Sequence, residues 1–105
     1  MHVITVAHDS PFHGHEKFDL VDGPGNDPTV FKAAVTAVCN AAINGNKPIL
    51  VHCHGGRSRS AAVLVAAIAR LNNLSVFEAY ERVIAKHDPV RIHPAMSKLL
   101  MEVQV

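Results

Sequence analysis

The chain has 105 residues, of which 49% are hydrophobic and 18% are charged. This balance predicts a folded globular chain and excludes a disordered one. Ten Lys and Arg residues against nine Asp and Glu residues leave a net charge of +1. No charge excess points to nucleic acid or to a membrane surface as a partner. We therefore expect one domain spanning residues 1–105.

The two cysteines, Cys39 and Cys53, give neither a disulfide framework nor a zinc-ligand pattern. The eight histidines show no ligand spacing either, so we expect no metal and no other cofactor. No segment has the pattern of a signal peptide, and the longest apolar run, residues 61–69, is too short for a bilayer. A reducing, cytoplasmic location is expected, which suits a free reactive thiol.

Three segments have the pattern of strands. Residues 2–7 are rich in β-branched side chains and predict a buried strand. Residues 17–21 predict a short second strand, and an irregular loop follows over residues 22–27. Residues 49–52 form a short apolar run directly before a glycine-bearing turn, which predicts a third strand.

Helices are expected between and after these strands. Asp27 followed by Pro28 is a helix start that should lead to Asn44, with Gly45 as a left-handed stop. The further helices are expected over residues 60–71, residues 75–87 opened by a capping box, and residues 94–103. Alternating strands and helices predict a three-layer α/β domain with a small, mainly parallel sheet flanked by helices.

The segment from residue 49 to residue 69 predicts a strand, a turn and a helix, an arrangement that binds anions through backbone amides. Its turn carries several candidate phosphate ligands. They are His54, Gly55, Gly56, Arg57 and Ser58.

Reactive groups stand at both ends of this turn. A thiol at Cys53, among amides and beside a helix N-terminus, is in a setting that favours the nucleophilic thiolate. Arg59 offers a planar fork for two phosphate oxygens. Ser60 can donate a hydrogen bond to the sulfur, and His52 is expected to support the turn rather than to act as a base.

The segment Val51-His52-Cys53-His54-Gly55-Gly56-Arg57-Ser58-Arg59-Ser60 resembles the active-site motif of the dual specificity phosphatases, a branch of the cysteine-dependent protein tyrosine phosphatase superfamily. Every defining position matches, and Gly55 stands where alanine is usual. The resemblance implies the protein tyrosine phosphatase fold and a phosphocysteine intermediate.

The resemblance also implies a general acid on a loop about thirty residues before the cysteine. Asp22 lies 31 residues before Cys53 and is our candidate. Asp27, five residues later, is expected to cap the next helix. Asp19 is a weaker rival that we expect within the second strand.

The matched pattern runs from the first strand to the last helix, whereas family members normally begin with two further strands and a helix. The resemblance therefore implies an N-terminally reduced fold, with the strand that ends at Cys53 on an open sheet edge. Residues 102–105 or a second subunit in a homodimer are the candidates to cover this edge.

The function that follows is hydrolysis of phosphotyrosine, and of phosphoserine and phosphothreonine, in proteins or peptides. One alternative keeps the chemistry but acts on phospholipids, such as phosphatidylglycerophosphate or phosphoinositides. A less favoured one is a phosphopeptide-binding module without turnover. Two smaller alternatives stay open: a histidine between His8 and His15 that touches substrate, and a disulfide between Cys39 and an oxidised Cys53.

Overall fold

The computed structural model describes the chain except for residues 12, 46–47, 54–57, 87–91 and 104–105. Within the described residues, three strands and four helices follow one another along the chain. They are β1 (His2–Thr5), β2 (Glu16–Lys17), α1 (Pro28–Asn44), β3 (Ile49–His52), α2 (Ser58–Asn72), α3 (Val76–Lys86) and α4 (Pro94–Val103).

The strands form a parallel sheet in the order β2-β1-β3. Strand β1 pairs with β3 along its whole length, from His2 opposite Ile49 to Thr5 opposite His52. Parallel strands end at the same edge of a sheet, so the segments that follow β1 and β3 meet there. In the described part of the chain, β3 pairs only with β1 and lies at one edge of the sheet, as the sequence predicted.

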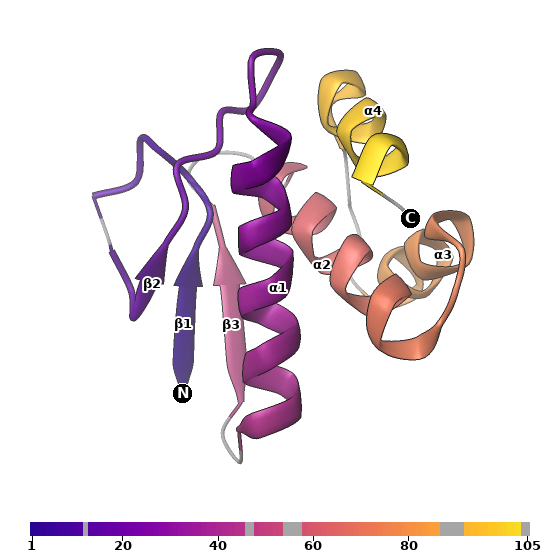
Figure 1. Ribbon diagram of the computed structural model, residues 1–105, viewed down its shortest axis with the longest axis horizontal. Helices are drawn as coiled ribbons and strands as arrows, with labels where there is room; N and C mark the ends of the chain where they lie inside the picture. Colours follow the sequence, from indigo (N-terminus) through magenta and orange to yellow (C-terminus); the bar gives the residue numbers. More distant parts are fainter. Residues whose placement is uncertain (12, 46–47, 54–57, 87–91, 104–105) are drawn as a thin grey trace.

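The elements stack in three layers (Figure 1). The sheet is the first layer, α1 and α2 pack on each other as the second, and α3 and α4 lie beyond α2 as the third. Helix α1 contacts β1 and β3, and α2 contacts β3, so the apolar sides of these helices meet the sheet. The small parallel sheet with its helical layers confirms the α/β fold expected from the alternating pattern.

Side chains from all three layers form one core. Its largest fully buried members are Phe31, Ile4, Leu20, Met96, Val6, Val35, Val63, Val65 and Thr5. Helix α2 packs against α1, α3, α4 and β3, which explains why most of its surface is apolar. Among the described helices, none alone is long and apolar enough to cross a membrane; α2 and Val76–Ala85 pass that test only as a pair bent by 117°.

The caps predicted at Asp27 and Ser75 are present in the structure, whereas the conformation predicted for the end of α1 is not. The Asp27 carboxylate accepts a hydrogen bond from the Thr29 amide at 2.9 Å, which confirms this cap. The Ser75 hydroxyl accepts from the Glu78 amide at 3.1 Å, as a capping box requires. The prediction of a left-handed conformation at Gly45 is wrong. The chain leaves α1 in an extended conformation, with a φ of −97° and a ψ of 145° at Gly45.

Strand boundaries differ from the sequence prediction. Strand β1 ends at Thr5 rather than at residue 7, although the Val6 amide still donates to the His52 carbonyl at 2.9 Å. Strand β2 covers two residues instead of 17–21. The Leu20 amide donates back to the Phe18 carbonyl at 3.0 Å, and this local turn interrupts the regular ladder. The segment nevertheless stays beside β1 and the residues that follow it, because the Phe18 amide donates to the Thr5 carbonyl at 2.8 Å and the His8 amide donates to the Leu20 carbonyl at 3.1 Å.

Candidate active site

Two neighbouring segments of the chain lie at the carboxyl edge of the sheet. Cys53 directly follows β3, and Ser58, Arg59 and Ser60 form the first turn of α2. The fold thus brings the two ends of the predicted phosphate turn to one place. Four predicted ligands lie outside the described residues: His54, Gly55, Gly56 and Arg57.

The Cys53 sulfur contacts the first turn of α2 directly. Its Sγ lies 3.4 Å from the Ser60 Oγ, within hydrogen-bonding reach for sulfur, and the Cys53 residue is half-buried. When the sulfur is a thiolate, the hydroxyl is the partner that carries a proton to donate. This is the contact that the sequence predicted for Ser60.

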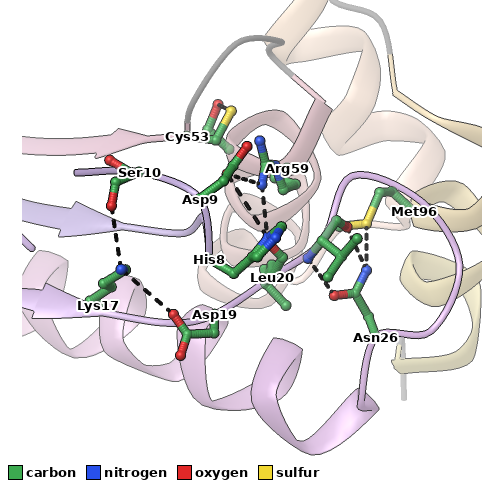
Figure 2. A network of polar contacts seen from close by, with 12 residues as sticks. His8, Asp9, Ser10, Lys17, Asp19, Leu20, Asn26, Cys53, Arg59 and Met96 are labelled. Atoms are coloured by element: carbon green, nitrogen blue, oxygen red, sulfur yellow. Dashed lines mark hydrogen bonds and ion pairs between the residues drawn. The ribbon is translucent and has the colours of Figure 1, made fainter. Parts of the chain in front are cut away.

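Arg59 is almost completely buried, with 3% of its side chain exposed. Its Nη1 donates to the Asp9 Oδ1 at 2.7 Å and to the Leu20 carbonyl at 3.1 Å. Figure 2 shows Asp9 lying between Cys53 and the guanidinium group. A buried guanidinium needs such partners, because an unpaired charge away from water is costly.

Asp9 is the site residue that sequence reasoning missed. The hydrogen bond from Arg59 is the largest cause that holds the pKa of Asp9 below its ordinary value, and burial opposes it. His8 adds to this: its Nδ1 lies 3.9 Å from Oδ1 of Asp9 and 3.3 Å from the Leu20 carbonyl. The signal was present in the sequence, since Asp9 follows β1 at the edge where Cys53 follows β3.

His52 is tied to the neighbouring strand. Its Nε2 lies 2.8 Å from the Oγ1 of Thr5, the residue directly opposite it in β1. Thr5 is fully buried, so this contact fixes the imidazole next to Cys53 from inside the sheet. The supporting position predicted for His52 agrees with this geometry.

The acidic residues of the loop before α1 lie in different surroundings. Asp22 is exposed and belongs to an irregular loop, while Asp27 is occupied as the cap of α1. Asp19 lies after the end of β2 rather than within the strand; it is 72% exposed and 3.8 Å from the Lys17 ammonium. Of the three, Asp22 alone lies in the irregular loop without serving as a helix cap, and its role as the general acid stays a prediction.

Ser58 lies in the predicted phosphate turn, but its hydroxyl serves another element. The Ser58 Oγ accepts a hydrogen bond from the His93 amide at 2.7 Å, and the residue is 5% exposed. His93 directly precedes α4, and its Nδ1 accepts from the Ala95 amide at 3.0 Å as a cap. The contact therefore joins the end of the turn to the start of α4.

The histidines before β2 separate into two groups. His15 accepts a hydrogen bond from the Val3 amide at 2.9 Å and stacks on His2 at 4.9 Å, near the start of β1 and away from Cys53. His8 lies beside Asp9 at the site. In the described part of the chain, no three His, Cys, Asp or Glu side chains gather in a way that could hold a metal ion.

Cys39 is packed in the core between α1 and α2. It is 4% exposed, and its Sγ lies 3.8 Å from the Ala67 carbonyl. Burial raises the pKa of the Cys39 thiol above its usual value. These surroundings agree with the packing role predicted from the sequence.

The family model for the dual specificity phosphatase catalytic domain matches residues 18–105 of this chain. The chain is 37% identical over 64 residues to human dual specificity phosphatase 28, covering 61% of this chain and 36% of that protein. It is 28% identical over 88 residues to the dual specificity protein phosphatase PHS1 of Arabidopsis thaliana, covering 83% of this chain and 9% of the relative. The chain thus spans only a minor part of these relatives.

Solved structures agree in fold. The crystal structure of human DUSP28 superposes with a TM-score of 0.80 at 25% identity, covering 95% of this chain and 73% of that one. A mouse putative dual specificity phosphatase complexed with zinc tungstate gives a TM-score of 0.81 at 23% identity, covering 95% and 66%. Cys53, Arg59 and Ser60 all fall inside the 88 residues that the family model matches. This chain belongs to the dual specificity phosphatase catalytic domain family.

Proposed function

We propose that residues 1–105 act as one phosphatase domain that hydrolyses phosphate monoesters through a phosphocysteine intermediate. The observation that carries the proposal is the meeting of Cys53 and Arg59 at the sheet edge, with the Ser60 hydroxyl 3.4 Å from the sulfur. Nucleophile, phosphate ligand and a group that stabilises the sulfur anion are then within reach of one phosphoryl group.

Arg59 binds the phosphoryl group with one edge of its guanidinium. Nη1 carries two N–H groups, and Asp9 and the Leu20 carbonyl accept from this nitrogen. The other edge, formed by Nε and Nη2, is the one that matches two phosphate oxygens. Asp9 and Leu20 thus hold the planar fork in a fixed orientation before substrate arrives.

In the first step, the Cys53 thiolate attacks phosphorus opposite the leaving oxygen. The S–P bond forms, the P–O bond to the leaving group breaks, and Asp22 gives its proton to the departing oxygen. In the second step, Asp22 as a carboxylate takes a proton from water as the water oxygen bonds to phosphorus. The P–S bond breaks, and the Ser60 hydroxyl stabilises the returning thiolate.

Phosphotyrosine, phosphoserine and phosphothreonine in proteins or peptides are the proposed substrates. The relatives are named dual specificity phosphatases, and this name supports substrates of both kinds. The mechanism requires a reduced thiol at Cys53, so we place the activity in a reducing compartment such as the cytoplasm.

The decisive experiment compares wild type with Cys53→Ser on p-nitrophenyl phosphate, using Cys39→Ala as the matched cysteine control. We expect turnover to vanish in Cys53→Ser and to persist in Cys39→Ala. Rapid quenching of wild type should trap one phosphoryl group on the peptide that contains Cys53. Turnover by Cys53→Ser would refute the proposed nucleophile.

A substrate panel then separates the alternatives. Phosphotyrosine and phosphothreonine peptides should be hydrolysed faster than phosphatidylglycerophosphate or phosphoinositides. Faster hydrolysis of either lipid would favour the phospholipid function, and vanadate binding without any turnover would favour a phosphopeptide-binding module.

We also propose that a second subunit covers the open edge at β3. In the described residues β3 pairs with β1 alone, and Leu50 at its middle is 45% exposed. Residues 104–105 lie outside the described residues, and α4 packs on α2 and α1. Light scattering over a concentration series should show a dimer; a monomer at every concentration would reject this proposal and leave the enzymatic one intact.

A further inference from the structure

One side chain holds the two residues that flank the proposed general acid. The Val21 amide donates to the Asn26 Oδ1 at 2.8 Å. The Asn26 Nδ2 lies 2.7 Å from the Val21 carbonyl and 3.1 Å from the Gly23 carbonyl. Asp22 is the residue between Val21 and Gly23, so the Asn26 carboxamide contacts the backbone on both sides of Asp22.

The orientation of this carboxamide follows from its partners. A backbone N–H needs the amide oxygen, and two backbone carbonyls need the NH₂ group, so one rotamer serves all three contacts. The Gly23 amide also donates to the Val21 carbonyl at 3.0 Å, which tightens the turn at Asp22. Residues 21–23 belong to no strand, and the Asn26 side chain supplies hydrogen bonds to their backbone groups that a neighbouring strand would otherwise supply.

The same nitrogen connects the loop to the core. Asn26 Nδ2 lies 3.3 Å from the Met96 Sδ, and Met96 is fully buried in α4 (Figure 2). The residue directly before α4 also holds the end of the phosphate turn, through the bond from the His93 amide to Ser58. The loop of Asp22 and the turn of Cys53 are therefore anchored on one helix end.

We propose that Asn26 is a positioning residue for the general acid, which keeps Asp22 where it can protonate the leaving oxygen. This inference rests on the proposed function, because it assumes that Asp22 is the acid. Without the carboxamide, the backbone on both sides of Asp22 loses its local partners and its link to α4. The carboxyl group then samples more positions and is in place for a smaller fraction of encounters.

The test uses two substrates that differ in their need for a proton. Phenolate is a poor leaving group and needs the acid, whereas p-nitrophenolate leaves readily without it. In Asn26→Ala of the full chain, we expect kcat for phenyl phosphate to fall ~10–100-fold. For p-nitrophenyl phosphate the fall should stay below ~3-fold, and the inhibition constant of vanadate should not change.

Asn40→Ala is the matched control, since Asn40 is an exposed asparagine on α1 outside the proposed machinery. Its ratio of the two rates should equal that of wild type. Asn26→Asp gives a second variant of the same size that keeps an acceptor for the Val21 amide and loses the donors. It should show the same selective loss on phenyl phosphate even where Asn26→Ala folds poorly.

The variant Asp22→Asn separates this inference from the proposed function. Adding Asn26→Ala to Asp22→Asn should cause no further selective loss, because the group to be positioned is already gone. If Asp22→Asn shows the selective loss and both Asn26 variants keep the wild-type ratio, the positioning proposal is overturned alone. If Asp22→Asn itself keeps the wild-type ratio, the acid assignment and this inference fail together, while the role of Cys53 stands.

Discussion

Asp9 and Arg59 form an ion pair 50 positions apart in sequence, with Oδ1 and Nη1 separated by 2.7 Å. The Arg59 side chain is buried and the Asp9 side chain is 42% exposed, so the pair lies at the boundary between the core and the surface. Its geometry makes Asp9 the orienting partner of the proposed phosphate ligand.

Replacing Asp9 should affect catalysis through Arg59. In Asp9→Ala the buried guanidinium loses a charged partner, so we expect kcat/KM for p-nitrophenyl phosphate to fall ~10-fold. Asp9→Asn keeps an acceptor oxygen and should lose less. Asp19→Asn is the control, because Asp19 is exposed and pairs only loosely with Lys17. Equal rates in Asp9→Ala and wild type would show that the guanidinium is oriented without Asp9.

The same pair predicts a pH dependence of stability. Because the pKa of Asp9 is held below its ordinary value of 3.8, its ionised form is favoured in the folded state. The stabilisation is fully present above the unfolded-state pKa and is lost as the pH falls through the folded-state pKa, below about pH 4. Urea unfolding of wild type and Asp9→Asn should therefore differ at pH 6, and the difference should disappear as the pH falls through the folded-state pKa of Asp9, below the ordinary value of 3.8. A difference that stays constant over this range would contradict the assignment.

Ser60→Ala should slow the second chemical step more than the first. In the proposed mechanism the Ser60 hydroxyl stabilises the departing thiolate, and a hydrogen bond to a charged group contributes about 1.5–3 kcal/mol, or ~10–100-fold in rate. We expect the initial burst of p-nitrophenolate to remain and the steady state to slow, with phosphocysteine accumulating. Stopped-flow absorbance with quenched mass spectrometry measures both; a loss of the burst without accumulation would argue for a role in the attack instead.

Thr5→Val tests the support of His52 from β1. The change keeps the volume of a fully buried side chain and removes the hydroxyl that lies 2.8 Å from the imidazole. Losing this hydrogen bond should lower the free energy of unfolding by about 1–3 kcal/mol and reduce kcat as the imidazole beside Cys53 loses its orientation. Thr36→Val is the matched control, because it removes an exposed hydroxyl of α1 that accepts a hydrogen bond from Arg70 at 3.0 Å, outside the proposed machinery. Unchanged kcat in Thr5→Val would limit the contact to a structural role.

Asp27→Ala should separate the cap from the acid. The carboxylate accepts from the Thr29 amide, so its loss should destabilise the protein by about 1 kcal/mol. In Asp27→Ala the ratio of kcat for phenyl phosphate to kcat for p-nitrophenyl phosphate should equal that of wild type. Asp22→Ala, in contrast, should lower kcat for phenyl phosphate by ~10²–10⁴-fold. The reverse result would move the acid from Asp22 to Asp27.

The sequence predicted those features that depend on neighbours in the chain. The Asp27 cap, the Ser75 capping box and the strand before Cys53 are all local, and the structure confirms them. It missed the pairing of Asp9 with Arg59, which arises only when the residues after β1 come beside the start of α2. It also missed the contact of Asn26 with Met96, which requires α4 to pack near the loop. The length of β2 was overestimated because a turn within residues 18–20 interrupts the regular ladder, which the side-chain pattern does not reveal.

The loop of Asp22 and the turn of Cys53 both contact the start of α4, so the order of synthesis affects when Cys53 becomes reactive. A ribosome completes Asp22, Cys53 and Arg59 well before His93 and Met96. Until α4 leaves the exit tunnel and docks, Asn26 cannot contact the Met96 sulfur and Ser58 cannot accept the hydrogen bond from the His93 amide. A nascent chain at that stage carries every reacting group of the proposed mechanism in an unassembled site. The thiol of Cys53 then lacks the folded surroundings that favour the thiolate, so it should react slowly until the site has assembled.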